Sequence, residues 1–331
     1  MTIAEPVWPR VGDVVDEIKH VLARSDDIVC LAHKDADADS LGSALAFAAS
    51  MRAMGKRTHP TVPDPVPYML AYLPGFDTIE TDPANLDTLF TFDCATVSRF
   101  GEKHRYLERA HCVINIDHHV SNEGFGHINV IEPEASATGQ VVYDLLRALD
   151  APIPRDAATN LYAALFTDTG GFRHENTTER ALRLGADLVA LGADPGWVAL
   201  QSYNSRSVSQ VRLEGLALAR MRVELDGRLV WSEVTQAMLA EAGADVQESE
   251  GVIDQLQSVG TMKIALLFKE TAPSVTKLSV RTRDEFDATD VCRPFGGGGH
   301  RRAAGAEIAQ PFLDVREQVL ALTRRLLQRA G

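Results

Sequence analysis

The sequence contains no hydrophobic run of the roughly 20 residues that a membrane-spanning helix requires. Its first ten residues, MTIAEPVWPR, lack the basic start and the apolar core of a signal peptide. We therefore expect a cytoplasmic protein with no membrane partner. The four cysteines show no CxxC spacing, so we expect buried, reduced thiols and neither zinc ligands nor disulfides.

A net positive charge is also missing from the chain. The formal net charge is −13, which argues against loose, non-specific binding along nucleic acid. Residues 271–331 are the exception, because they carry ten Lys and Arg against seven Asp and Glu. An acidic protein that acts on an anionic substrate would need metal ions and a few well-placed arginines.

The first 170 residues alternate apolar, strand-like runs with helical patterns. This alternation predicts an α/β fold in which a parallel sheet has helices on both faces. Ligands bind such sheets at the carboxyl ends of the strands, where His33, Asp93 and Asp117 follow or end three of the runs. We expect these three residues to converge. The predicted strands are 27–32, 88–93 and 112–117, and the predicted helices are 40–55, 136–149 and 157–170.

The pattern changes after residue 205, and 331 residues are enough for two domains. We place the first domain at 1–205, a linker helix at 206–220, and a smaller α/β domain at 221–331. The second domain begins with a predicted hairpin in which Asp226 and Gly227 form a two-residue turn. Two further strands, 262–270 and 275–283, precede a glycine run and a terminal helix.

The stretch CLAHKDADADSLGSAL, residues 30–45, crowds three aspartates together directly after His33. Mutual repulsion disfavours Asp35, Asp37 and Asp39 in one loop unless cations neutralise them. The alternative is a solvated loop that caps a helix beginning at residue 40, with Ser40 or Asp39 as the N-cap. Partners elsewhere in the chain decide between a metal site and a cap.

Such partners occur in NIDHHVSN, where His118 and His119 follow Asp117 at the end of an apolar strand. Asp93 and Asp168 add two carboxylates on loops at the same predicted edge, although Asp168 alternatively caps a helix end or a turn. Carboxylate oxygens combined with imidazoles suit Mn²⁺ better than Ca²⁺ or zinc. This many carboxylates would serve two ions about 3.5–4 Å apart, bridged by one aspartate.

The chain contains five motifs that, in this order, resemble those of the DHH phosphoesterase family. HKDADADSLGS, FTFDCATVSRFG, NIDHH and FTDTGGF look like the four motifs of the catalytic domain. FGGGGHRRAAG looks like the glycine-rich motif of the DHH-associated C-terminal domain. The resemblance covers about residues 28–309. It implies a catalytic DHH domain at 1–205 and a substrate-binding domain at 221–331.

The resemblance also implies a role for each residue of the predicted metal site. Asp93 would bridge the two ions, Asp117 would orient its neighbours, and His119 would face the scissile phosphate. Asp35 matches no ligand position. The expected cofactor is two Mn²⁺ ions, with Mg²⁺ or Co²⁺ as substitutes. The implied ligands are His33, Asp37 and Asp93 for one ion, and Asp39, Asp93, His118 and Asp168 for the other.

A second set of residues resembles the substrate-binding positions of the family. Arg281 looks like its substrate-phosphate arginine and is alternatively a surface arginine on a strand. Arg99 resembles a basic position of the second motif and is alternatively a helix-capping or surface arginine. Gly297, Gly298 and Gly299 would let the backbone approach a ligand closely, and their amides would cradle a phosphate beside His300. The alternative for the glycine run is a flexible linker.

Within the family, the short chain and the glycine motif resemble the bifunctional oligoribonucleases (nanoRNases) that also act as pAp phosphatases. This branch implies exonucleolytic hydrolysis of short RNA, or short single-stranded DNA, to mononucleotides, and conversion of pAp to AMP. The nearest alternative is a soluble phosphodiesterase for linear or cyclic dinucleotides such as pApA, pGpG or c-di-AMP. A nucleotide-binding regulator with an inert metal site is the alternative from another class. We expect a monomer or a homodimer.

Overall fold

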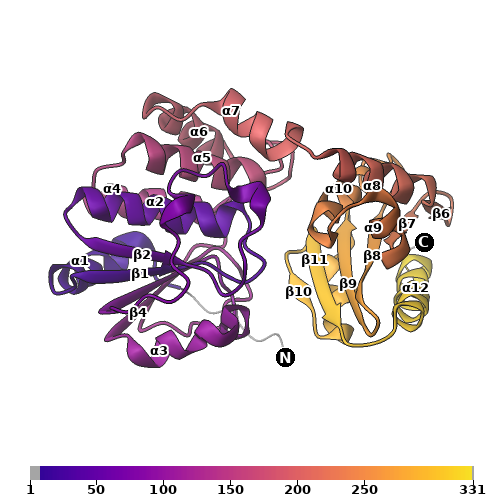
Figure 1. Cartoon of the computed structure of the whole chain (residues 1–331), viewed down its shortest axis with the longest axis horizontal. Helices are drawn as coiled ribbons and strands as arrows, with labels where there is room; N and C mark the ends of the chain where they lie inside the picture. Colours follow the sequence, from indigo (N-terminus) through magenta and orange to yellow (C-terminus); the bar gives the residue numbers. More distant parts are fainter. Residues whose placement is uncertain (1–7, 330–331) are drawn as a thin grey trace. The chain divides into compact units, whose positions relative to one another are not determined.

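The computed structural model describes residues 8–329. Two compact units meet at the bond between Ser205 and Arg206, and each is described by itself (Figure 1). Among the described residues, we find no helix that combines the length and the apolar character required to cross a membrane. The four cysteines are all free thiols.

The first unit is built on a five-stranded sheet in which every neighbouring pair is parallel. Its order is β2-β1-β3-β4-β5, so the three predicted strands form its centre. The edge strand β2 contains Pro60, which an edge position tolerates because fewer backbone amides are paired there. The predicted α/β class is confirmed. The strands are β1 (Asp27–Leu31), β2 (Arg57–Thr61), β3 (Thr88–Phe92), β4 (Cys112–Asp117) and β5 (Ile128–Ile131).

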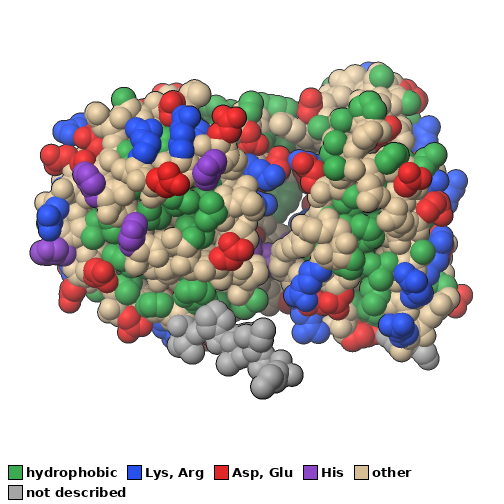
Figure 2. All heavy atoms as spheres, turned by 90° about the horizontal axis from the view of Figure 1, so that it is seen from below, with side chains coloured by type: hydrophobic (Ala, Val, Ile, Leu, Met, Phe, Trp, Pro, Cys, Tyr) green, Lys and Arg blue, Asp and Glu red, His purple; other side chains and the backbone are tan. Residues whose placement is uncertain are grey.

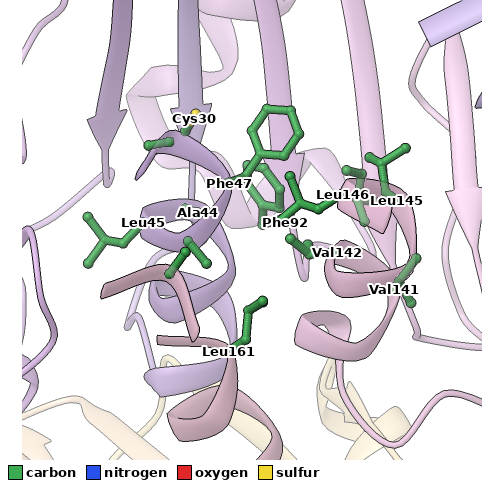
Figure 3. Packing of buried hydrophobic residues seen from close by; sticks show 14 of the residues in the cluster. Cys30, Ala44, Leu45, Phe47, Phe92, Val141, Val142, Leu145, Leu146 and Leu161 are labelled. Carbon is green, nitrogen blue, oxygen red and sulfur yellow. The ribbon is translucent and has the colours of Figure 1, made fainter. Parts of the chain in front are cut away.

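Both faces of this sheet are buried at its three central strands β1, β3 and β4, which explains why apolar residues stand on both faces of these strands. One face packs against helices α2, α4 and α5, where the rings of Phe47 and Phe92 lie 5.5 Å apart (Figure 3). On the other face, Val29 and Leu31 pack with Tyr106 of α3. The helices are α1 (Val11–Ala23), α2 (Ala38–Ala53), α3 (Arg105–Arg109), α4 (Thr138–Ala148), α5 (Arg155–Asp168), α6 (Glu179–Ala190) and α7 (Pro195–Ala199).

Helix α2 begins earlier than the sequence predicted. Its N-cap is Asp37, whose carboxylate accepts a hydrogen bond of 2.9 Å from the amide of Ser40. The prediction that Ser40 or Asp39 caps this helix is therefore wrong. The earlier start places Asp39 in the first turn, where it is buried.

The second unit contains a six-stranded sheet of order β10-β11-β9-β8-β7-β6, in which only β7 and β8 pair in parallel. Helix α12 packs on one face, and helices α8, α9 and α10 pack on the other. Residues 206–220, the predicted linker helix, contain α8, which contacts α9 and α10. The strands are β6 (Arg222–Glu224), β7 (Leu229–Val234), β8 (Ile264–Ala272), β9 (Val275–Thr282), β10 (Gly298–Gly299) and β11 (Ala303–Ile308). The helices are α8 (Val208–Ala219), α9 (Gln236–Ala242), α10 (Glu250–Leu256), α11 (Ala288–Cys292) and α12 (Phe312–Arg329).

The predicted hairpin at the start of this unit is present, but its turn is longer than expected. Glu224 pairs with Leu229, so the turn has four residues and not two. Leu225, Asp226 and Gly227 all have positive φ angles, of 52°, 58° and 88°. Three consecutive left-handed residues do not fit a two-residue turn, which provides only two central positions.

Candidate metal centre

The carboxyl ends of β1, β3 and β4 bring their polar residues to one edge of the first sheet. His33 follows β1, Asp93 comes directly after β3, and Asp117 is the last residue of β4. The Nε2 atom of His33 lies 3.4 Å from Oδ2 of Asp93, and all three residues are buried. Parallel pairing of neighbouring strands produces this convergence, as the sequence predicted.

Asp93 lies between two groups of potential ligands. Its Oδ2 faces His33, while its Oδ1 lies 3.5 Å from Nε2 of His118. Asp37 completes the first group, with its Oδ2 3.8 Å from Nε2 of His33. The backbone of Asp93 has φ = 59°, an unusual angle for a non-glycine residue that is often found at functional sites.

The second group consists of Asp39, His118 and Asp168. The Nε2 atom of His118 lies 3.8 Å from Oδ2 of Asp39 and 3.8 Å from Oδ2 of Asp168. Asp168 is the last residue of α5 and is more exposed than its two partners. One cation with bonds of about 2.0–2.2 Å can join ligand atoms separated by these distances.

Both imidazoles in these groups are oriented as metal ligands. Nδ1 of His33 lies 2.7 Å from the carbonyl oxygen of Lys34, and Nδ1 of His118 lies 3.0 Å from that of Ala135. A carbonyl oxygen only accepts, so each Nδ1 carries a proton, and Nε2 is the ring atom left for a metal. Both Nε2 atoms face carboxylates, so the donor set fits a divalent metal.

Asp117 accepts more hydrogen bonds from the protein than these carboxylates do. Its Oδ1 accepts from the amides of His118 (2.7 Å) and His119 (3.2 Å) and from Nδ1 of His119 (2.7 Å). Its Oδ2 accepts from Asn122 at 2.5 Å. Asp117 could form a third ligand group with Asp93 and His119, but these hydrogen bonds favour an orienting role.

The electrostatics of the cluster show that negative charge is in excess. Burial raises the pKa of Asp39 well above its usual range, and the charges of Asp93 and Asp168 raise it further. Burial also opposes ionisation of Asp93, but His119 and His33 hold the pKa of that carboxyl well below its usual range. A bound cation would offset the free-energy cost of ionising Asp39.

Two residues that the sequence analysis did not assign hold the carboxylates in place. The amides of Thr138 and Gly139, at the start of α4, donate to the two oxygens of Asp39 at 2.8 and 2.9 Å. The hydroxyl of Thr138 donates to Oδ1 of Asp93 at 2.8 Å. A Cβ atom at Gly139 would lie only 2.7 Å from that of Ala164. The one signal in the sequence was a Thr-Gly pair at a predicted helix start, where amides bind anions.

Asp35, the acid that matched no ligand position, lies outside every potential ligand group of the described residues. It is exposed and has φ = 53°, and its amide donates to Oδ2 of Asp64 at 3.0 Å. Aspartate tolerates this left-handed conformation better than most residues do. Asp35 therefore shapes the turn that leads from His33 to Asp37.

Arg99 lies in the 3₁₀ segment η3 (Val97–His104), beyond the end of β3. Its carbonyl oxygen accepts from the amide of Lys34 at 2.9 Å, which joins this segment to the loop after β1. Its side chain is half-buried. Its charge partly opposes the rise in the pKa of Cys94 that burial causes.

Arg281 and the glycine run belong to the second unit. Arg281 is half-buried on β9, opposite Ala303 of β11. The amide of Gly297 donates to the carbonyl oxygen of Cys292 at 3.0 Å, and that of His300 donates to Ala303 at 2.8 Å. These two amides are therefore bonded within the protein, and Gly298 and Gly299 pair with β11 as strand β10.

Two of the glycines are required by the close packing of β10 on β11. A Cβ atom at Gly297 would lie 2.3 Å from the carbonyl oxygen of Gly305, and Gly299 has φ = 136°. A Cβ atom at Gly298 would meet nothing within 4 Å. Gly298 is thus the one member of the predicted trio that neither packing nor backbone angle explains.

The charged side chains outside the cluster are mixed in sign. On the face drawn in Figure 2, Lys and Arg side chains are interspersed with acidic ones over both units. This view shows no continuous basic surface. The arrangement agrees with the net charge of −13, which argued against non-specific nucleic-acid binding.

The fold and the cluster are those of a metal-dependent phosphoesterase, and the chain belongs to the DHH family. The DHH family N-terminal domain matches residues 27–165, and the DHHA1 domain matches residues 228–329. These matches confirm the family resemblance that the five motifs indicated.

Several proteins are similar to the chain over most of its length. The bifunctional oligoribonuclease and PAP phosphatase NrnA of Thermus thermophilus is 32% identical over 98% of this chain and 96% of its own. The NrnA of Bacillus subtilis is 23% identical over 88% of this chain and 92% of its own. The crystal structure of an exopolyphosphatase-related protein from Bacteroides fragilis superposes with a TM-score of 0.86 at 26% identity, covering 95% of this chain and 97% of that one.

Proposed function

We propose that this protein is a two-metal phosphoesterase that hydrolyses short oligonucleotides exonucleolytically to mononucleotides and dephosphorylates pAp to AMP. One observation carries the proposal. The carboxylate of Asp93 faces two ligand groups at once, and each group contains an imidazole whose Nδ1 is bonded to a backbone carbonyl. The similarity to the NrnA proteins supports the choice of substrates.

The proposed cofactor is a pair of Mn²⁺ ions, with Mg²⁺ or Co²⁺ as substitutes. Carboxylate oxygens mixed with imidazole nitrogens suit Mn²⁺, whereas Ca²⁺ takes oxygen ligands and structural zinc takes fewer and softer ones. Two such ions supply Lewis acidity that activates water and neutralises phosphate charge. The proposed ligands are His33, Asp37 and Asp93 on one side, and Asp39, Asp93, His118 and Asp168 on the other.

The protein itself would orient the phosphate and stabilise its developing charge. Nδ1 of His119 is bonded to Asp117 at 2.7 Å, which leaves Nε2 as the ring atom that meets the scissile phosphate. Thr138 keeps Asp93 in position through its hydroxyl. Groups fixed before the reaction stabilise a transition state without reorganising during it.

The second unit would hold the end of the substrate that is not cleaved. Arg281 is the proposed phosphate ligand there, together with Gly298, Gly299 and the side chain of His300, while Arg99 would contact phosphate in the first unit. A pocket for one terminal nucleotide favours short substrates, and pAp offers a second phosphate on a single nucleotide. Specific metals and a few arginines would then replace a broad basic surface.

A panel of substrates with Mn²⁺ tests this proposal. It contains 5′-labelled and 3′-labelled RNA from dinucleotides to long chains, the matching DNA, pAp, linear and cyclic dinucleotides, and pyrophosphate. We expect the highest kcat/KM on RNA of two to about five residues and on pAp. Faster turnover of a cyclic dinucleotide would favour the alternative function, and binding without turnover of any substrate would favour the regulator.

The substrate-end pocket is tested by Arg281→Ala. The expected result is a rise in KM of about tenfold for di- to pentanucleotides, with little change for a small chromogenic phosphodiester, since only the longer substrates reach this residue. Lys277→Ala is the matched control, because Lys277 is a half-buried cation on the same strand that pairs with Glu307. Equal effects of Arg281→Ala on both kinds of substrate would remove Arg281 from the pocket.

A further inference from the structure

We propose that Asn122 is a positioning residue that fixes the ring of His119 by holding Asp117. Asn122 is the last residue of the stretch NIDHHVSN, and it lies outside the proposed metal ligands. Its catalytic consequence rests on the proposed function, whereas its effect on the geometry of His119 does not.

The side-chain amide of Asn122 uses its full hydrogen-bonding capacity. Its Nδ2 donates to Oδ2 of Asp117 at 2.5 Å and to the carbonyl oxygen of Cys94 at 3.1 Å. Its Oδ1 accepts from the amide of Gly124 at 2.8 Å and from Nδ2 of Asn115 at 3.0 Å. An asparagine amide has two donor hydrogens and two acceptor lone pairs, so no other bond is left to make.

The partners of Asn122 fix which way its amide points. A backbone amide can only donate, so Gly124 must face the oxygen of Asn122. A backbone carbonyl can only accept, so Cys94 must face the nitrogen. The group that meets Asp117 is therefore a donor, and Oδ2 of Asp117 must be an acceptor. Asn122 therefore occupies the second oxygen of Asp117 and holds the carboxylate in one orientation.

With Oδ2 held by Asn122, the other oxygen of Asp117 points at His119. It lies 2.7 Å from Nδ1 of the ring and also accepts the backbone amides of His118 and His119. This bond directs Nδ1 of the ring toward Asp117 and fixes the plane of the ring. The orientation of Nε2, which faces the phosphate in our proposal, thus depends on Asn122 through one intermediate carboxylate.

The sheet in turn holds Asn122. Asn115 of β4 is buried and pairs in register with Thr91 of β3, whose hydroxyl donates to Oδ1 of Asn115 at 3.0 Å. That bond turns the amide nitrogen of Asn115 toward Asn122. Buried polar networks in which every member is satisfied hold a single arrangement, because any other leaves a desolvated group unpaired.

The test compares Asn122→Asp with Asn129→Asp in the full-length, metal-loaded protein. Asn129 is a matched control, because its Nδ2 also donates to two acceptors, here the carbonyls of Gly126 and Gly124. Its Oδ1 also accepts a backbone amide, that of Gly126, and Nδ2 of Asn115. Both substitutions keep the shape of the side chain and remove its donors. Only Asn122→Asp places a second carboxylate against Asp117.

We expect Asn122→Asp to lower kcat by about 10- to 100-fold, the usual cost of losing a group that orients an active-site residue, and to leave KM nearly unchanged. Asn129→Asp is expected to keep kcat. Equal losses from the two variants would mean that both act through loop stability alone and would overturn the proposal.

Imidazole ¹⁵N NMR of the Mg²⁺-loaded protein gives a readout that does not depend on turnover. The Nδ1–H proton of His119, identified by its absence in His119→Gln, should be visible and slow to exchange in the wild type and in Asn129→Asp. It should be lost in Asn122→Asp. A signal that persists in Asn122→Asp would overturn the proposal even if activity fell. If the wild type hydrolysed none of the substrates, the proposed function would fail while the NMR result still decided the role of Asn122.

Destabilisation by Asn122→Asp is separated from positioning by a double-mutant cycle with Asp117→Asn. The loss of stability caused by Asn122→Asp should shrink in the Asp117→Asn background, because the facing charge is gone. The loss caused by Asn129→Asp should be the same in both backgrounds. Additivity at both positions would show that Asn122 and Asp117 are uncoupled, against the proposal.

Discussion

The two ends of the parallel sheet contain aspartates whose pKa values are shifted in opposite directions. At the amino end, Asp27 begins β1 and its carboxylate accepts from Arg57 at 2.9 and 2.5 Å. Hydrogen bonds from Arg57 and His59 lower the pKa of Asp27 to about 2. At the carboxyl end, burial and the neighbouring charges of Asp93 and Asp168 raise the pKa of Asp39 well above its usual range.

The two ends differ in the source of the positive charge that neutralises their carboxylates. The chain provides its own cations for Asp27, so that carboxylate belongs to the stability of the fold. At the carboxyl end, the carboxylate of Asp39 accepts from the amides of Thr138 and Gly139 and from the hydroxyl of Ser43. These donors carry no charge, so the cluster stays negative. Buried carboxylates in excess of their cations are costly, so we interpret this end as built for cations that come from solution.

The largest expected effect is on hydrolysis, which should depend on the carboxyl end of the sheet and not on the amino end. Asp93→Ala should abolish Mn²⁺-dependent hydrolysis, a loss greater than the about 10- to 100-fold that indirect partners of a metal site usually cost. Asp93 contacts both ligand groups, so its removal would affect both ions. Initial rates on a dinucleotide, with circular dichroism to confirm the fold, measure this.

Asp27→Ala is the control for that experiment, because it removes a buried aspartate from the other end of the same sheet. It should lower stability and keep kcat. Near-normal rates for Asp93→Ala, or an equal loss from Asp27→Ala, would contradict the two-metal proposal.

The sequence predicted the contents of the carboxyl end well, since local patterns carry that information. The apolar runs before His33, Asp93 and Asp117 marked three strands, and parallel pairing then required their ends to meet. Local patterns also misplaced the start of α2, because Asp37 and Ser40 are both good N-caps and only the fold decides between them.

Contacts between segments far apart in the chain could not be predicted from the sequence. The hydrogen bond from the amide of Thr138 to Asp39 joins residues 99 positions apart, and no periodicity signals it. The same holds for the amide of Asn122, which reaches back 28 residues to the carbonyl of Cys94. The clustering of polar residues at the strand ends could thus be predicted from the sequence, whereas the groups that hold them required the packed structure.

The second expected effect is stabilisation of the carboxyl end by metal. A cation that binds only the folded protein adds about 2.7 kcal/mol to the free energy of unfolding at a hundred times its Kd. Because the pKa of Asp39 is raised on folding, its contribution is complete below its unfolded value of 3.8 and is lost as the pH rises through the folded value. Metal-free protein should therefore lose stability as the pH rises, and the shift in Tm caused by Mn²⁺ should grow.

Thermal unfolding with and without Mn²⁺ at several pH values measures this second effect. Asp27→Ala should keep the full metal-induced shift, and Asp39→Asn should lose most of it. A shift that is equally large in Asp39→Asn would mean that the cation binds elsewhere.

The smallest expected effect belongs to the amino end and has the opposite dependence on pH. Because the pKa of Asp27 is lowered to about 2, its contribution is complete above the unfolded value of 3.8 and is lost as the pH falls toward 2. Arg57 is largely exposed, so we expect Asp27→Asn to cost only about 1 kcal/mol at pH 7. Urea unfolding should show this difference between wild type and variant shrinking below pH 3.8 and unaffected by Mn²⁺. A carboxylate that the chain itself neutralises is not stabilised by an added cation. If the difference grew on acidification or responded to Mn²⁺, the two ends of the sheet would not be electrostatically distinct.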